Sequence, residues 1–556
     1  MNWIIFILLI ILGGILSVCF GQATNEFDVL NYHIYAPYAF LTHRIGFDIL
    51  PCGIRSYFNP ILDIPYYFMV KYWNEFPTLV TFLQGTYYGI ILFIGYKISD
   101  LIFIENSRTK VYFNLFSVII IGTSAVIMYE VGTLYNDLQV AIFICTALYL
   151  YLKYLFEVDS NKRSLMLVLA SALLGAVFGL KLTSAIMIFG MFIAAVCFVR
   201  KIDKPLKTLF ICALSFFLGF IVVNGYWYYL MYSTFKNPFF PYYNNIFKSE
   251  YGSFFAVLDE SYKQVLPVGW FKKVFYPFLF FAPKRGSGFG SWLFRYVDWR
   301  YALTSFAIFY LSIKIFLQRK FEESKLSDKR VLFLIIFTLS TYIVWLNVFA
   351  IVRYIVPLII ISCILINASL VYLADLIKNK SIFNVTFNEV FITLSLLLLA
   401  LLFNTTKISI NETRLSLTEK VFDIRDVKIK DNSLVLLASQ MTSIIIPYQN
   451  KNARYAYLVI PIDVNLENTA FTYKERTIDY YYSEYYEKQV NQLIKGTKDI
   501  YFVYLDDIYS VEKDLYNRAM IYYTGKPMKF ENCKKIADPL MYGRLSNITI
   551  CKLSKL

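Results

Sequence analysis

Long apolar blocks recur along the chain up to residue 403 and set the main limit on its fold. A helix needs about 20 apolar residues to cross the hydrocarbon core of a bilayer, so the blocks predict about eleven transmembrane spans in a mainly α, polytopic bundle. The lipid bilayer is therefore an expected partner. The blocks lie at residues 3–22, 77–96, 111–129, 138–156, 164–180, 182–199, 206–226, 301–318, 331–350, 355–377 and 386–403.

The composition agrees with a membrane protein, because 58% of the residues are hydrophobic and only 17% are charged. Soluble domains of ordinary composition carry about 25% charged residues. No Lys or Arg precedes the block at 3–22, and the length of this block suits a span. We therefore expect a retained transmembrane helix there and not a cleaved signal peptide.

The formal net charge is +15, and the basic residues of the short loops lie almost entirely on one side. Positive residues favour cytoplasmic loops, so the pattern predicts a cytoplasmic N-terminus and places the long segments 23–76, 227–300 and 404–556 outside. Because membrane orientation accounts for these basic loops, we expect no nucleic-acid partner. The basic residues concerned are Lys97, Arg108, Lys110, Lys153, Lys162, Arg163, Arg200, Lys201, Lys204, Lys207, Arg319, Lys320, Lys325, Lys329, Arg330, Lys378 and Lys380.

The sequence after residue 403 becomes mixed and polar. Short apolar runs are separated there by polar stretches, and helical character appears around 484–495, so a small C-terminal α/β domain is expected. We divide the chain into a transmembrane domain at 1–403 and an extracytoplasmic domain at 404–556. The apolar runs lie at 433–438, 456–462 and 499–505.

The cysteines and histidines limit the metal chemistry. The eight cysteines include no CxxC pair, which excludes a zinc signature, and the two histidines, His33 and His43, exclude a histidine-rich site. Cys533 and Cys551 lie in the predicted outer domain, where an oxidising compartment would allow a disulfide. Two free thiols are an equal alternative.

The first predicted external segment carries polar residues close to the first span. Asp28 and Glu26 follow that span within a few residues, and Tyr32 and His33 lie about one helical turn further on, so all four can share a face. The alternative is an interfacial loop whose charges are simply solvated. Two later polar residues of the same segment are Asn59 and Asp63.

Asp137 lies at the outer start of the fourth predicted span. It could be an N-terminal cap, which the helix dipole favours. It is also predicted to lie on the same side of the membrane as Asp28, so the two carboxylates could meet in one cavity. Such a pair can bind a divalent cation such as Mg or Mn, or divide the roles of base and orienting group.

Two cations stand where the positive-inside rule disfavours them. Lys181 lies at the tip of a tight hairpin, and Arg353, followed by Tyr354, lies in the next short external turn. Each could extend to lipid headgroups. Together they predict an external anionic ligand such as a phosphate. Asn237 belongs to another external turn, rich in Pro and aromatic residues, which could instead follow the membrane surface.

The order of these segments resembles the GT-C superfamily of multi-spanning glycosyltransferases, which use polyprenyl-phosphate-linked sugars. The resemblance covers roughly residues 1–400. Each motif alone is weak, and their joint order, spacing and sidedness carry the match. The segments are Asp28-Val29-Leu30-Asn31-Tyr32-His33, Asn59-Pro60 with Asp63, Asn136-Asp137, Gly179-Leu180-Lys181-Leu182-Thr183, Lys236-Asn237-Pro238-Phe239-Phe240-Pro241 and Arg353-Tyr354-Ile355-Val356-Pro357.

The resemblance implies roles for the acidic residues. Asp28 matches the catalytic carboxylate of the first external loop, and Asp137 matches a second acidic position. Glu26 is separated from Asp28 by one residue, which leaves its catalytic role open. No metal requirement follows, because members of the family differ; a divalent cation would use Asp28 and Asp137. The substrate-binding candidates are Tyr32, His33, Asn59, Asp63, Lys181, Asn237, Arg353 and Tyr354.

The expected function is transfer of a sugar from a polyprenyl-phosphate-linked donor to a glycan, lipid or protein acceptor outside the membrane. Asp28 would act as the base of an inverting displacement. One alternative is a polysaccharide polymerase or oligosaccharyltransferase that transfers a whole glycan. A transporter or flippase is another, although the sequence shows neither an internal repeat nor broken helices. The composition favours a bacterial plasma (inner) membrane.

Overall fold

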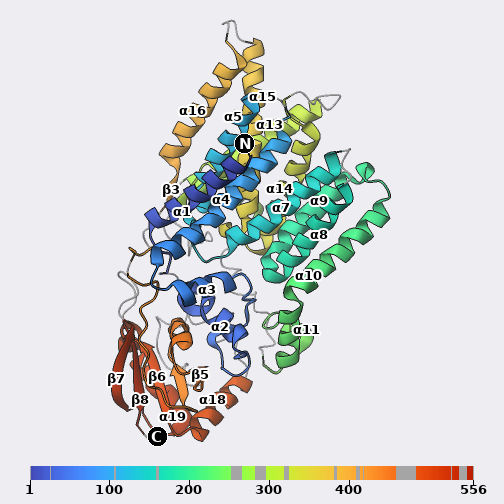
Figure 1. The fold of residues 1–556 in the computed structure, drawn as a ribbon. Coiled ribbons are helices and arrows are strands. Elements are labelled where there is room, and N and C mark those ends of the chain that lie inside the picture. Colours follow the sequence, from blue (N-terminus) through green and yellow to red (C-terminus); the bar gives the residue numbers. More distant parts are fainter. Residues whose placement is uncertain are drawn as a thin grey trace. The chain divides into compact units, whose positions relative to one another are not determined.

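The computed structural model describes residues 2–24, 27–104, 108–157, 162–251, 266–281, 296–317, 325–380, 385–408, 414–417, 419–458, 484–527, 529–537 and 547–554. The chain forms two compact units, each built from several stretches of sequence (Figure 1). Unit 1 comprises Met1–Ser17, Phe82–Asn224 and Tyr262–Ile410, and unit 2 comprises Val18–Thr81, Gly225–Ser261 and Asn411–Leu556. The predicted division of the chain after residue 403 stays a prediction.

Nine helices within the described ranges are long and apolar enough to cross a membrane. This confirms a mainly helical, polytopic fold. Two of the eleven predicted blocks form shorter helices, α5 (Arg108–Gly122) and α9 (Ala185–Cys197). The nine are α1 (Asn2–Phe20), α4 (Pro77–Ile102), α7 (Asp137–Phe156), α8 (Arg163–Leu180), α10 (Pro205–Phe235), α13 (Arg300–Leu317), α14 (Asp328–Val348), α15 (Val356–Lys380) and α16 (Phe387–Thr405).

The block predicted at 111–129 is interrupted inside its range. Helix α5 ends at Gly122, and Ser124 has an extended backbone with ψ of 139° before the short helix α6 (Ala125–Tyr129) begins. At about 1.5 Å per residue, the 15 residues of α5 span roughly 22 Å, less than the hydrocarbon core of about 30 Å. The break directs the chain towards the loop that precedes α7.

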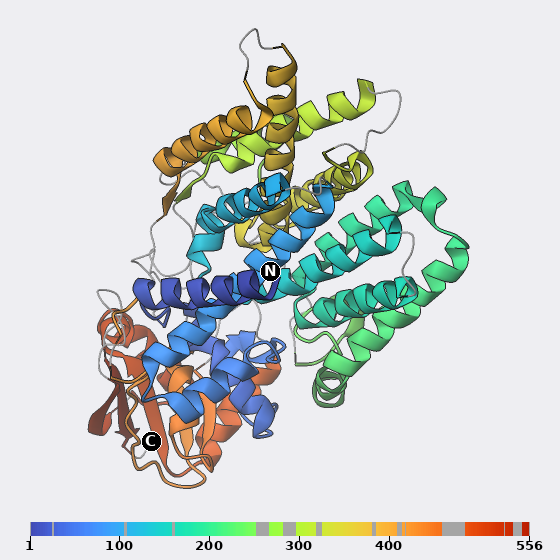
Figure 2. The ribbon, with the colours of Figure 1, turned by 45° about the horizontal axis from the view of Figure 1, so that its top comes forward.

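Helix α15 is the centre of unit 1. It contacts α5, α13, α14 and α16, while α7 packs on α8 and α9 packs on α14 (Figure 2). The apolar stretch that includes α15 is 78% buried, as expected for a helix that is hydrophobic on all sides.

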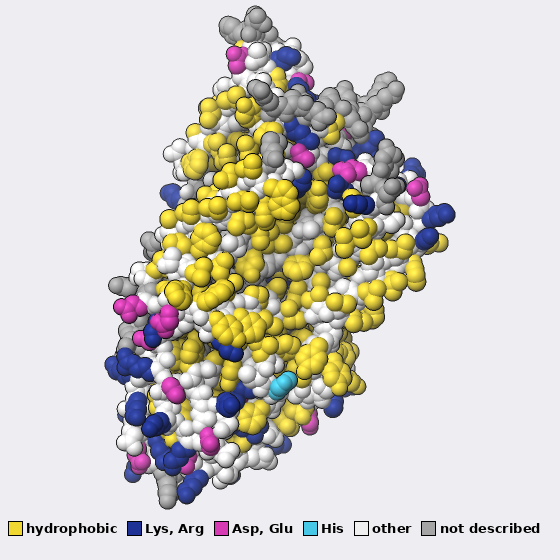
Figure 3. All heavy atoms as spheres, viewed as in Figure 1, with side chains coloured by type: hydrophobic (Ala, Val, Ile, Leu, Met, Phe, Trp, Pro, Cys, Tyr) yellow, Lys and Arg dark blue, Asp and Glu magenta, His cyan; other side chains and the backbone are white. Residues whose placement is uncertain are grey.

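Helix α10 differs from α15, because only 6% of its most apolar window is buried. Exposed side chains along it include Leu206, Phe210, Phe217 and Val222. On the face seen in Figure 3, hydrophobic side chains gather over the helices of unit 1. An apolar face of this extent suits contact with lipid.

Unit 2 is built around a five-stranded mixed sheet with the order β5-β4-β6-β8-β7. Strand β4 pairs in parallel with β5 and β6, whereas β8 is antiparallel to β6 and β7. The sheet and helix α18 confirm the predicted C-terminal α/β pattern. The elements are β4 (Leu434–Leu437), β5 (Arg454–Tyr457), β6 (Ile500–Leu505), β7 (Phe530–Ala537), β8 (Ile548–Leu553), α18 (Glu484–Gly496) and α19 (Asp506–Thr524).

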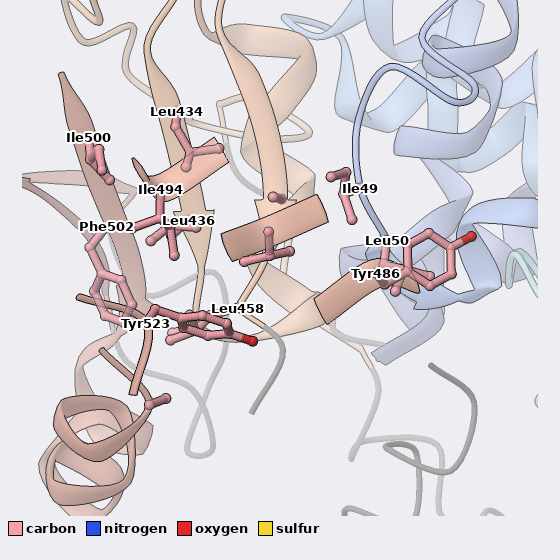
Figure 4. Close-up of a cluster of buried hydrophobic side chains, with 14 of the residues drawn as sticks. Ile49, Leu50, Leu434, Leu436, Leu458, Tyr486, Ile494, Ile500, Phe502 and Tyr523 are labelled. Carbon is pink, nitrogen blue, oxygen red and sulfur yellow. The ribbon is translucent and has the colours of Figure 1, made fainter. Parts of the chain in front are cut away.

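The core of unit 2 joins this sheet to residues from early in the chain. Ile49 and Leu50 belong to the same buried cluster as Leu436 and Phe502 (Figure 4). The backbone of Ile49 also pairs with β5, next to Tyr455 and Tyr457. The remaining early elements are η1 (Val29–His33), α2 (Tyr35–Leu41), β1 (Pro51–Ile54), η2 (Arg55–Tyr57) and α3 (Ile64–Trp73).

Cys533 and Cys551 form a disulfide between β7 and β8, so the two thiols are not free.

Several short elements complete the description. The two-stranded pair is β2 (Tyr296–Val297) with β3 (Lys407–Ile408). The other short elements are η3 (Leu182–Ser184), η4 (Val199–Lys201), α11 (Asn244–Phe247), α12 (Trp270–Val274), η6 (Tyr276–Phe281), η7 (Val352–Ile355) and η8 (Gln440–Tyr448).

The contact between α1 and α4 depends on glycines. A Cβ on Gly85 would overlap the carbonyl oxygen of Gly13, and a Cβ on Gly89 would overlap that of Leu9. Small residues allow this close backbone approach, which is a common way to pack helices in a membrane.

We expect Gly85→Val to lower the free energy of unfolding by about 1–3 kcal/mol, because the added methyl groups separate α1 from α4. The loss can be measured as thermal denaturation of the purified protein in detergent. Gly496→Val is the control, since no atom lies within 4 Å of a Cβ at that position. Equal stability of the Gly85 variant and the wild type would contradict the packing argument.

Candidate active site

Asp28 directly precedes η1, a turn of π-helix at Val29–His33. The Asp28 side chain is half-buried and makes no capping hydrogen bond to the turn. Short π-helical turns occur often at functional sites, because they displace side chains from their ordinary helical positions. Glu26 lies outside the described residues.

His33 and Asp63 form a buried pair in unit 2. Nδ1 of His33 lies 2.7 Å from Oδ1 of Asp63, and the two side chains are only 1% and 3% exposed. In a neutral imidazole that donates from Nδ1 to Asp63, the other ring nitrogen, Nε2, is an acceptor. Nε2 is buried and has no hydrogen-bond partner within the described part of the chain. The ring of Tyr32 lies 4.2 Å from the imidazole, centroid to centroid.

Turn η1 is held by η8 (Gln440–Tyr448), from the C-terminal part of unit 2. The Asn31 Nδ2 amide donates to Gln440 Oε1 over 3.2 Å. The backbone carbonyl of Asn31 accepts from the Ser443 hydroxyl and, over 3.0 Å, from the Cys52 thiol. The residues next to Asp28 and His33 are therefore positioned by a segment hundreds of residues away in sequence, which no local pattern reveals.

A buried ion pair between Arg44 and Asp48 supports the same segment. Arg44 Nε and Nη2 donate to the two Asp48 oxygens over 2.6 and 2.7 Å. The Tyr35 hydroxyl and the Tyr455 backbone N–H also donate to Asp48, while Arg44 donates to the carbonyl of Ala453. Burial raises the pKa of Asp48, and the Arg44 guanidinium opposes this effect. The pair was not predicted, because residues 44–48 form turns and not a helix, so its i, i+4 spacing carries no helical signal.

Asn59 and Asn237 organise turns. Asn59 Oδ1 accepts from the Ile61 backbone N–H over 3.1 Å. The buried amide of Asn237 donates to the Tyr242 carbonyl and accepts from the Phe239 backbone N–H. A role of Asn237 in substrate binding stays a prediction.

Asp137 and Lys181 meet in unit 1. Asp137 is the first residue of α7, and its side chain does not cap that helix. Lys181 follows the last residue of α8, and its ammonium group forms an ion pair with Asp137 Oδ1. The same ammonium group donates to the Tyr135 carbonyl over 3.0 Å. Lys181 is thus bound within the unit, although its side chain is still 22% exposed.

Arg353 approaches the same carboxylate from η7 (Val352–Ile355). Its Nε lies 3.7 Å from Asp137 Oδ2, and its guanidinium carbon lies 4.6 Å from the ring centroid of Tyr135. Tyr354 is close to both cations, with its ring centroid 5.3 Å from the Lys181 ammonium and 5.5 Å from the Arg353 guanidinium carbon. The predicted residues Asp137, Lys181, Arg353 and Tyr354 therefore form one cluster, which we call the Asp137 cluster.

Glu130 adds a second carboxyl group to the surroundings of this cluster. Its Oε2 accepts from the Thr133 hydroxyl over 3.1 Å, and its Oε1 is buried without a hydrogen-bond partner in the described ranges. Burial, together with the charge of Asp137, raises the pKa of the Glu130 carboxyl to about 8, while Arg353 and Lys181 act in the opposite direction. Glu130 was not among the predicted site residues, because one Glu before a span carries no specific pattern.

Asp298 and Arg300 support the loop that carries Glu130. The Asp298 carboxylate accepts from the Ala125 backbone N–H over 2.9 Å at the start of α6, and from Arg300 Nη1 over 2.9 Å. Arg300 also donates to the Ile120 carbonyl and the Thr123 hydroxyl. This buried pair fixes the break between α5 and α6, and nothing in the sequence pattern separates it from an ordinary loop.

The donor groups do not favour a metal in the Asp137 cluster. Both oxygens of Asp137 already face cations, and a cation ligand set would need several oxygen donors. Across the described ranges, no group of three His, Cys, Asp or Glu side chains is arranged to hold a metal ion. The reaction proposed below therefore includes no divalent cation.

The architecture defines a polytopic membrane protein, and solved structures share its fold. Two structures of ArnT from Cupriavidus metallidurans, one bound to undecaprenyl phosphate and one in the apo state, match 99% of this chain and 97% of their own, with a TM-score of 0.52. Their sequences are 11% and 12% identical to this one. The chain therefore has an ArnT-like fold, which confirms the GT-C resemblance at the level of the fold.

A further match is an oligosaccharyltransferase from Archaeoglobus fulgidus, solved in complex with Zn and sulfate. It covers 97% of this chain and 73% of its own, with a TM-score of 0.47 and 11% identity. No family model matches the chain, and no curated protein matches it in sequence.

We expect Asp63→Ala to lower the free energy of unfolding by about 1–3 kcal/mol, because the His33 Nδ1–H would stay buried without an acceptor. Thermal denaturation in detergent measures the loss. Asp63→Asn is the matched variant, since its amide oxygen can still accept, and it should lose less. Equal losses in both variants would show that the imidazole does not depend on this bond.

Proposed function

We propose that this chain is a membrane glycosyltransferase that takes its sugar from a polyprenyl-phosphate-linked donor. The observation that carries the proposal is the pair of cations Lys181 and Arg353 on one carboxylate, at the ends of apolar helices. Lys and Arg bind phosphate groups through charge-assisted hydrogen bonds, and apolar helices suit the lipid tail that such a donor carries. The ArnT-like fold supports the proposal, since the similar ArnT structure contains undecaprenyl phosphate.

The proposed reaction is a single displacement with inversion. The acceptor hydroxyl oxygen forms a bond to the anomeric carbon, and the bond from that carbon to the phosphate oxygen breaks. Asp28 takes the hydroxyl proton, and the polyprenyl phosphate leaves with the electron pair. A single base suffices for this route, whereas retention through a covalent intermediate would need a nucleophilic carboxylate as well.

Lys181 and Arg353 have an electrostatic role in this proposal. The phosphate gains negative charge as it leaves, so fixed cations stabilise the transition state more than the ground state. Tyr354 and Tyr135 keep the cations in place through their ring faces.

The acceptor is a cell-envelope glycan, lipid or protein, and Tyr32, His33 and Asn59 are the residues proposed to contact the substrates.

The proposed location is a plasma (inner) membrane, with the N-terminus in the cytoplasm and the C-terminal domain outside. The basic loops support this orientation through the positive-inside rule. The Cys533–Cys551 disulfide supports it too, because structural disulfides persist in oxidising compartments.

We expect Asp28→Asn to reduce sugar transfer by about 10²–10⁴-fold, because an amide cannot accept the hydroxyl proton. The assay supplies a panel of radiolabelled polyprenyl-phosphate sugars and a crude lipid acceptor fraction to protein in nanodiscs. Glu75→Gln, which changes a largely exposed carboxylate of the same unit, should keep wild-type activity. Full activity of the Asp28 variant would remove Asp28 as the base.

We expect Lys181→Met to lower kcat/KM for the donor by about 10- to 100-fold, because one charged hydrogen bond to the phosphate is lost. Lys153→Met is the matched control, since Lys153 pairs with Glu157 near the opposite end of α7. The measurement is the same assay with varied donor concentration. An unchanged donor KM and kcat in the Lys181 variant would contradict the proposed phosphate site.

A further inference from the structure

The charges around Asp137 do not balance unless Glu130 is ionised. Lys181 and Arg353 contribute two positive charges, and Asp137 contributes one negative charge. An ionised Glu130 would bring the sum to zero, whereas a neutral Glu130 leaves one positive charge for a ligand. The protonation state of a single carboxyl group therefore decides whether this cluster attracts an anion.

The geometry allows Glu130 to exist in both states. Its Oε2 already accepts from Thr133, while its Oε1 is buried without a hydrogen-bond partner among the described residues. Such an oxygen destabilises the ionised form, because burial removes water and no donor replaces it. A protonated Oε1 would supply an additional hydrogen-bond donor. The groups that act on Glu130 are Asp137 on α7, Lys181 after α8, Arg353 on η7 and Thr133 in its own loop.

We propose that Glu130 makes the Asp137 cluster a proton-linked anion site, in which binding of a phosphodiester anion is coupled to protonation of Glu130. This inference rests on the phosphate site of the proposed function and adds its regulation. The linkage is reciprocal, so the ligand raises the proton affinity of Glu130 and the proton raises the affinity for the ligand. In the binding step, ionised Glu130 takes up one proton and the cluster binds one anion. The product is neutral Glu130 with the anion bound.

The direction of the pH dependence follows from the buried carboxyl group. Its raised pKa means that Glu130 is neutral below the transition and ionised above it. Affinity for the anion should therefore be highest on the acidic side and fall as the pH rises. The decrease should reach roughly tenfold between about pH 7 and about pH 9 if only the neutral form binds.

The test measures binding of a short-chain isoprenyl methyl phosphodiester to the full chain in detergent. A phosphodiester keeps a single negative charge over this pH range, so its own titration does not contribute. Isothermal titration calorimetry in two buffers of different ionisation enthalpy gives the affinity and the number of protons taken up. On the alkaline side, the wild type should take up as much as about one proton per ligand bound.

Glu130→Gln is the decisive variant, because glutamine resembles the neutral acid and cannot titrate. It should bind the phosphodiester with an affinity that changes less than about twofold over the same pH range, and with no proton uptake. Glu157→Gln, at the end of α7 far along the helix from Asp137, should retain the wild-type pH dependence. A Glu130→Gln protein that does not fold leaves the proton uptake of the wild type as the test.

The outcomes separate this inference from the proposed function. Equal pH dependence in the wild type and the Glu130→Gln variant, or no proton uptake by the wild type on the alkaline side, would overturn the linkage while the phosphate site remains. No binding to the wild type at any pH, with Lys181→Met indistinguishable from it, would overturn the phosphate site and the inference with it.

Discussion

The interaction of Asp137 with Lys181 and Arg353 determines how the ends of three helices in unit 1 can be arranged. A charge beside apolar helices is costly unless an opposite charge lies close to it. Asp137 starts α7, Lys181 follows α8, and Arg353 lies just before α15, so one carboxylate joins the ends of three neighbouring segments. The same arrangement leaves two cations on one anion, and this imbalance makes the cluster suited to a further anionic group.

Much of the fold could be predicted from the sequence, because hydrophobic length is a local property. Nine apolar blocks become long helices, and the α/β pattern after residue 403 becomes a mixed sheet. One exception depends on contacts between distant parts of the sequence. The block at 111–129 is broken at Ser124, whose backbone is extended, and the buried Asp298–Arg300 pair holds that break in place. Hydropathy does not detect such an ion pair.

The candidate site was less predictable, because its residues come together through tertiary contacts. Lys181 and Arg353 stood out as cations where the positive-inside rule disfavours them, and Asp137 as an acidic residue at the outer start of a span. The structure brings the three together. Asn237 stood out equally, yet its amide is used by its own turn. Glu130 was overlooked, because its distinction is burial and not spacing. The hydrogen bond from the Ser443 hydroxyl to the Asn31 carbonyl joins positions more than four hundred residues apart, and a single sequence does not reveal such a contact.

Unit 2 also has a consequence for the order of synthesis. Its first stretch, Val18–Thr81, is synthesised early, but several hydrogen-bond partners of Asn31 and Arg44 belong to residues 440–455. The segment with Asp28 and His33 therefore cannot reach its final arrangement before residues 440–455 have been synthesised. A chain that lacked residues 440–455 would therefore leave this segment without its hydrogen bonds to Gln440, Ser443 and Ala453.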